Sequence, residues 1–159
     1  MTRTLDLDSL TLDKGSHAPD HTFCVMEAVA YVAGEAWSDQ PQCVDPVLTA
    51  YCIRLNDHWN DEQRQALKPY IARLVGTKGD LHLSRKRAFM AADAAVRIFA
   101  PLALDARGLP ERAAKLRAVP AIVDRASALA AAAAANAAAN AAAYAAALQL
   151  LDRMIEATA

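Results

Sequence analysis

Thr22 to Gly34, TFCVMEAVAYVAG, is the stretch that decides how this chain begins to fold. Thr22 is a residue type that caps helix starts, and Gly34 is a common helix stop. Apolar residues recur between them at three- and four-residue spacing, as on one face of a helix: Val25, Ala28, Val29 and Val32. We therefore predict a helix over residues 23–33 with this apolar stripe turned into the core.

Further helix signals follow along the chain. Asp45-Pro46 combines a capping acid with proline at the first helical position, so a second helix should start there and break at Asn56. We expect Asp61 to cap a third helix, and another helix to run from about Leu81 to Phe99.

The two ends of the chain have different patterns. Leucines alternate with polar residues between Leu5 and Leu12, which predicts a short strand or hairpin. From Ala121 onward alanine dominates without glycine or proline, which predicts one long helix. The fold class is thus mainly α: a multi-helix bundle with a long alanine-rich C-terminal helix and a small N-terminal β-hairpin or strand. We divide it into a compact helical domain with the strand segment, 1–120, and the long helix, 121–159, packed on that domain or extending from it.

Composition excludes some classes of function. The 159 residues carry a net charge of −1, so there is no basic surface to attract nucleic acid. Residues 126–151 are uncharged, but 17 of the 22 residues in 126–147 are alanine, too weakly apolar to favour membrane insertion. Three cysteines and an acidic N-terminus without an apolar leader indicate a reducing cytoplasm.

The chain is densest in reactive groups between His17 and Cys43. A thiol at Cys24, in the first turn of the predicted helix, would face the positive end of the helix dipole, which lowers a thiol pKa. His17 precedes it closely enough to act as a general base, and Glu27 lies one turn further along. One hypothesis is therefore a cysteine-centred enzyme with Cys24, His17 and Glu27 as catalytic residues.

The same stretch also permits a metal site. His17, His21, Cys24 and Cys43 would supply two nitrogens and two sulfurs, a tetrahedral set suited to zinc. No Cys-x2-Cys pair supports this hypothesis. The alternative to both chemistries is a buried cysteine that packs as a small apolar residue beside loop histidines.

The alanine-rich segment offers a contact surface. Four of its larger side chains recur every four residues: Asn136, Asn140, Tyr144 and Leu148. Small side chains between them allow another helix to approach closely, so this helix would form a homo-oligomer or bind a protein partner.

Several motifs in the first half of the chain resemble a group of uncharacterised proteins from actinobacteria and their phages. They are KGSH at 14–17, CVMEAVAYVAGE at 24–35, SDQPQC at 38–43, WND at 59–61 and LKPYI at 67–71. The resemblance implies a cytoplasmic bacterial or phage setting and brings no activity or catalytic residue with it.

The function predicted from the sequence is a soluble helical binding or regulatory protein of phage or mobile-element type that acts through protein–protein contacts. Its alternative is the cysteine-centred enzyme or metal-binding protein. Membrane and nucleic-acid partners are not expected.

Overall fold

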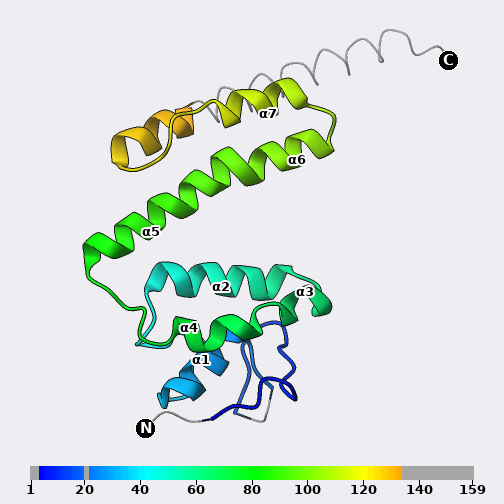
Figure 1. Ribbon diagram of the computed structural model, residues 1–159, viewed down its shortest axis with the longest axis vertical. Helices are drawn as coiled ribbons and strands as arrows, with labels where there is room; N and C mark the ends of the chain where they lie inside the picture. The colour runs from blue at the N-terminus through cyan, green and yellow to red at the C-terminus, as the bar shows by residue number, and fades with distance from the viewer. Residues whose placement is uncertain (1–3, 20–21, 134–159) are drawn as a thin grey trace, which may run out of the picture. The chain divides into compact units, whose positions relative to one another are not determined.

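The computed structural model describes residues 4–19 and 22–133, and most of them are helical (Figure 1). The prediction of a mainly α fold is confirmed. The predicted N-terminal strand or hairpin is not: the described residues contain no strand, only an isolated parallel bridge between Leu12 and Phe23. The chain turns at residues 7–9, where Leu10 N–H donates to the Asp6 carbonyl (3.1 Å), and this interrupts the alternating pattern.

Nine helical elements follow one another between Val25 and Arg117. They are α1 (Val25–Ala33), α2 (Pro46–His58), α3 (Asp61–Gln65), η1 (Lys68–Tyr70), α4 (Ile71–Leu74), α5 (Leu81–Ala94), η2 (Ala95–Phe99), α6 (Ala100–Ala106) and α7 (Pro110–Arg117). The chain divides into two compact units, Met1–Arg87 and Ala88–Ala159, so the division falls within α5.

Helix α1 is the centre of the first unit, and it contacts α2 and α4. Its N-cap is Cys24, not Thr22, because the Cys24 sulfur accepts the backbone N–H of Glu27. Gly34 ends the helix as predicted, at a φ of 75° that only glycine adopts readily. The helix is buried from Val25 to Ala30, on all sides and not along one stripe.

Helix α2 begins as predicted: the Asp45 side chain accepts the Val47 N–H, and Pro46 follows the cap. The predicted break at Asn56 is wrong, because the helix continues to His58. Asn56 remains helical because its side chain is hydrogen-bonded to other elements and does not compete for the helix backbone. The cap of α3 is Asn60, one residue before the predicted Asp61.

A single apolar cluster forms the core of the first unit. Its buried members come from the N-terminal segment, α1, α2 and the region of η1 and α4: Leu10, Leu12, Phe23, Cys24, Val25, Met26, Ala28, Val29, Val44, Cys52, Leu67, Ile71 and Leu74. Burial of this apolar surface is the main contribution to the stability of the first unit, and it holds α1 against the N-terminal segment.

Asp45 ties the start of α2 to α5. Its carboxylate is fully buried, accepts the Ser84 hydroxyl (2.5 Å) and forms an ion pair with Arg87 (2.9 Å). Burial alone would raise the pKa of Asp45, but the bonds from Ser84 and Arg87 outweigh it and hold that pKa below its ordinary value. Arg87 also donates to the Thr77 carbonyl (2.7 Å).

The second unit is built on the continuous run from α5 through η2 to α6. The helix predicted over Leu81–Phe99 is present but does not end there: η2 is a π-helical turn, with the Ala100 N–H donating to the Ala95 carbonyl. Pro101 lies two residues after the end of this turn. A proline within a helix removes one hydrogen bond and crowds the preceding turn, and the wider π-turn accommodates it.

Helix α7 packs against both η2 and α6. After it, Asp124 caps a helix that occupies residues 125–133, four residues later than the predicted start at Ala121. The rest of the predicted long helix, 134–159, lies outside the described residues, so the division into 1–120 and 121–159 stays a prediction.

We predict that Asp45→Asn lowers the free energy of unfolding by about 1–3 kcal/mol, because it leaves Arg87 without its buried partner. An asparagine still caps α2, so the change isolates the charge. Asp80→Asn, at an exposed residue that accepts the Leu83 N–H, is the matched control. Urea unfolding measures both, and equal losses would contradict the prediction.

The same carboxylate makes stability depend on pH. Since the folded-state pKa of Asp45 lies below its unfolded value of 3.8, its contribution is complete well above pH 3.8. It is lost as the pH falls through the folded-state value. The urea midpoint of the parent chain should therefore fall on acidification more steeply than that of Asp45→Asn.

Candidate functional site

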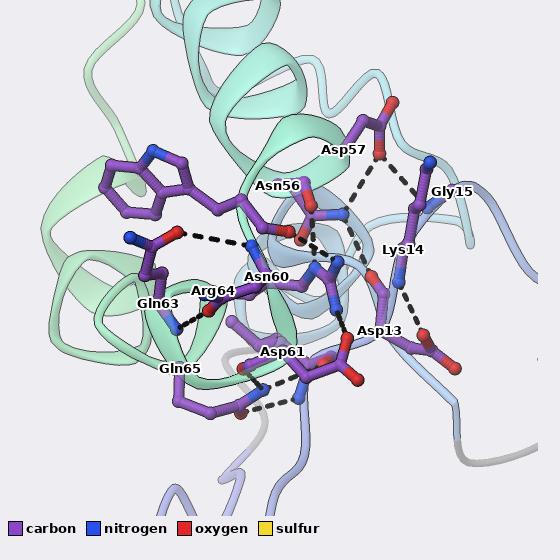
Figure 2. Close-up of polar contacts among 12 residues, drawn as sticks. Asp13, Lys14, Gly15, Asn56, Asp57, Asn60, Asp61, Gln63, Arg64 and Gln65 are labelled. Carbon is purple, nitrogen blue, oxygen red and sulfur yellow. Dashed lines mark hydrogen bonds and ion pairs between the residues drawn. The ribbon is translucent and has the colours of Figure 1, made fainter.

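Side chains from α2 and α3 bind the backbone of the N-terminal segment at residues 12–15 (Figure 2). Gln65, the last residue of α3, bonds both backbone groups of Leu12, at 2.9 Å to its N–H and 3.0 Å to its carbonyl. Asn56 donates to the Asp13 carbonyl (2.9 Å). Each of these bonds gives a partner to a backbone group that no strand neighbour satisfies.

Asp57 continues this arrangement at the end of α2. Its carboxylate accepts the Gly15 N–H (3.1 Å) and the Asn56 side-chain N–H (3.2 Å). Gly15 has a φ of 88°, so the segment turns there into a conformation that disfavours other residues. From this point beside the end of α2, the N-terminal segment continues toward the start of α1.

His17 lies beside Glu27, as the sequence hypothesis required. The Glu27 carboxylate accepts the His17 backbone N–H (2.5 Å), and the ring Nδ1 lies 2.9 Å from the other carboxylate oxygen. Glu27 is 1% exposed, which makes this a buried pair.

Glu27 also completes the cap of α1. Its carboxylate accepts the Cys24 backbone N–H (2.7 Å) while its own N–H donates to the Cys24 sulfur (3.4 Å). This is a capping box with cysteine in the place that serine or threonine usually takes. One carboxylate therefore fixes both the start of α1 and the fold of the segment at His17.

The expectation that Cys24 has a lowered pKa is wrong. The residue is 3% exposed, and burial raises the pKa of its thiol to about 12. Burial outweighs the positive helix end because it removes the water that would solvate a thiolate. The thiol is protonated at neutral pH, whereas nucleophilic attack requires the thiolate.

The three proposed catalytic residues thus come together in a different order from the one expected. Glu27 stands between the other two, and His17 and Cys24 each bond to it. Among the described residues no hydrogen bond joins the His17 ring to the Cys24 sulfur, and the catalytic role of the three residues stays a prediction.

The proposed metal ligands are only partly described. His21 lies outside the described residues. In residues 4–19 and 22–133 no three His, Cys, Asp or Glu side chains are grouped to hold a metal ion. Cys43 has a backbone role in the loop before α2, where its N–H donates to Glu35 (2.8 Å). The zinc site with His17, His21, Cys24 and Cys43 stays a prediction.

Trp37 and Trp59 are partly buried and both pack against the core cluster. The Trp37 indole N–H donates to the His17 carbonyl (2.7 Å), and its ring lies 4.9 Å from the Phe23 ring. The Trp59 carbonyl accepts a bond from Arg64 (2.9 Å). His17 is therefore held by Glu27 through its backbone N–H and its ring, and by Trp37 through its carbonyl.

A small pocket of about 110 Å³ opens beside Cys24. Its lining comes from the N-terminal segment, the loop after α1 and the end of α2: Gly15, Ser16, Cys24, Asp39, Ile53, Asn56 and Asp57. Water occupies about 30 Å³ per molecule in the liquid, so the pocket holds a few waters or one small chemical group.

Sequence reasoning missed Asn56, Arg64 and Gln65. Asn56 is 1% exposed and also accepts the Val25 N–H (3.1 Å), so it joins α2 to α1 and to the N-terminal segment. Buried Arg64 donates to the Asn56 carbonyl (2.6 Å) and to Asp61 (2.7 Å). Polar residues in helices normally face water, so nothing in their spacing distinguished these three.

Comparison with protein-family models, with curated proteins and with solved structures gives no match to this chain. None of the helices in the described part of the chain is long and apolar enough to cross a bilayer. What can be said of function therefore comes from the residues and their geometry.

We predict that iodoacetamide at neutral pH modifies Cys43 in the folded chain and leaves Cys24 and Cys52 unmodified. Burial raises the pKa of all three thiols, to about 12 for Cys24 and about 11 for Cys52, but Cys43 is partly exposed and the other two are buried. Mass spectrometry of the digested protein gives the order of modification. Unfolding in urea should make all three react, and rapid labelling of Cys24 before unfolding would contradict the assignment.

We predict that Glu27→Gln lowers the free energy of unfolding by about 2–4 kcal/mol, because an amide cannot accept the three N–H donors that the carboxylate binds. Glu62→Gln, an exposed change on α3, is the control and should cost less than about 0.5 kcal/mol. Urea unfolding followed by circular dichroism measures both. A Glu27→Gln chain as stable as its control would show that the buried carboxylate does not hold this site together.

Proposed function

We propose that the chain is a non-catalytic binding or regulatory protein that acts through protein–protein contacts. The observation that carries the proposal is an exposed apolar stripe in the second unit, made of Met90, Ile98 and Leu102, which we call the outer stripe. The cytoplasmic phage or mobile-element setting is part of the proposal and is supported by the sequence resemblance.

The helical run over residues 88–106 is apolar on two sides. One side meets α7 and includes buried Pro101 and half-buried Leu104. The residues of the outer stripe are exposed: Met90 is 62% exposed, Ile98 51% and Leu102 58%, and the neighbouring Phe99 is 50% exposed. A helix that is apolar on all sides is normally buried on all sides, so the stripe is expected to meet another protein surface.

The π-turn brings the outer stripe into line. In a regular α-helix each residue turns by about 100°, so Leu102 would lie about 120° round the axis from Met90. The turn at Ala95–Phe99 contains one residue more than an α-helical turn. The extra residue reduces the angle between Met90 and Leu102 by about 100°. Met90, Ile98 and Leu102 then share one side. π-turns are often found at functional sites, and here the turn shapes a contact surface.

Few charges interrupt this surface. Between Ala88 and Leu104 the sequence has only Asp93 and Arg97 as charged residues, and they form an ion pair with each other (3.1 Å). Asp93 also accepts the Ile122 N–H (2.9 Å), and both side chains of the pair are partly buried. A nucleic-acid or strongly charged partner would find no complementary groups on the outer stripe.

We predict that the full chain forms an assembly, measured by native mass spectrometry and light scattering, and that Leu102→Glu dissociates it. A carboxylate buried in an apolar contact must lose its water, which costs several kcal/mol. Ala114→Glu is the matched control, because it places the same carboxylate at an exposed position of α7.

A chain that is monomeric at every concentration would contradict the prediction that copies of the chain assemble. An assembly that Leu102→Glu and Ala114→Glu weaken equally would contradict the role of the outer stripe. Circular dichroism of both variants checks that the helices remain folded.

A further inference from the structure

We infer that residues 13–16 form a movable strap over Cys24. The strap moves away from α2 while the helices stay folded, and this movement opens the pocket beside the thiol to small molecules. The inference concerns the first unit alone. It goes beyond the proposed contact function, because it gives the first unit a conformational change that controls access to a reactive side chain.

The strap is held firmly at its two ends. At one end Leu12 is 1% exposed, and Gln65 bonds both of its backbone groups. At the other end His17 is bonded to Glu27 through its backbone N–H and to Trp37 through its carbonyl. These two anchors fix where the strap begins and ends, so any movement is confined to the residues between them.

Few contacts hold the strap between its anchors. Its residues are exposed or half-buried, and none of them belongs to the core cluster. The Asp13 N–H donates to the Phe23 carbonyl (2.8 Å), and the Asp13 carbonyl accepts from Asn56 (2.9 Å). The Gly15 N–H donates to Asp57 (3.1 Å). Segments with few buried apolar contacts open at a lower free energy than the whole domain, so the strap is expected to open before α1 or α2 unfolds.

The strap forms part of the wall of the pocket beside Cys24. Gly15 and Ser16 line this space of about 110 Å³ together with Cys24, and the rest of the lining comes from α2 and the loop after α1. Cys24 is 3% exposed although the pocket lies next to it. Movement of the strap would let water and small molecules reach the sulfur. It would also remove part of the burial that raises the pKa of the thiol.

Gly15 makes the closed position of the strap sensitive to substitution. Its φ of 88° lies in the left-handed region, and a Cβ at this position would lie within 4 Å of no atom beyond its chain neighbours. Alanine therefore fits the space but strains the backbone, and the strain is relieved when the strap moves. Gly76, after α4 in the same unit, has a φ of 76° and equally open surroundings. Gly76→Ala is thus a matched control that places the same strain away from the strap.

Labelling of the full chain with iodoacetamide over hours at pH 8 tests the inference, with mass spectrometry following each cysteine separately. Cys52 is buried on α2 and does not line the pocket, so its rate reports unfolding of the helices. Gly15→Ala should label Cys24 about tenfold faster than the parent chain and leave the rate of Cys52 unchanged. Gly76→Ala should leave the ratio of the two rates at its parent value.

Asp57→Ala loosens the strap from the side of α2. It removes the acceptor of the Gly15 N–H, and the loss of a hydrogen bond to a charged group should speed the labelling of Cys24 by about tenfold. It does not weaken α2, because alanine favours a helix and a carboxylate is unfavourable near a helix C-terminus. Asp57→Asn keeps an acceptor oxygen and should label Cys24 more slowly than Asp57→Ala.

Two results would overturn the inference. If Cys24 and Cys52 gain speed in the same proportion in the variants, the thiol is exposed by unfolding of the unit and there is no separate strap movement. If Gly15→Ala and Asp57→Ala both label Cys24 at the parent rate, the strap does not control access to the thiol. Circular dichroism identifies a variant that fails to fold, and the other variant then decides.

Discussion

The buried carboxylate of Glu27 is the contact on which the first unit depends. It accepts N–H groups from His17 and Cys24 and lies beside the His17 ring, at a place where water has almost no access. A buried charge is tolerated only when such donors surround it, so the positions of these groups are not independent. The start of α1 and the path of the N-terminal segment are fixed together.

The other contacts of the segment extend the same principle. Side chains of Asn56, Asp57 and Gln65 satisfy backbone groups that would belong to a sheet in another fold. Arg64 in turn donates a hydrogen bond to the Asn56 carbonyl (Figure 2). The reactive residue types around His17 and Cys24 thus have structural roles. The Glu27 carboxylate completes the cap of α1 and binds His17, and the Cys24 thiol packs in the core.

The two units differ in how they use apolar residues. The first unit encloses them in one cluster around α1. The second unit has few fully buried residues in its described part and leaves large apolar side chains on the outside of its longest helical run. This contrast is why the function proposed here is a contact made by the second unit.

Local chemistry along the chain was enough to determine the helical class, the stop at Gly34 and the start at Asp45-Pro46, because caps and prolines act on their immediate neighbours. Only the tertiary structure decided that Cys24 is a cap with a raised pKa, since its burial comes from distant residues. Tertiary contacts also decided the roles of Asn56 and Gln65, and the packing of α7 against α6 decided which side of that helix faces outward. Each of these depends on groups far apart in the sequence, which no local pattern records.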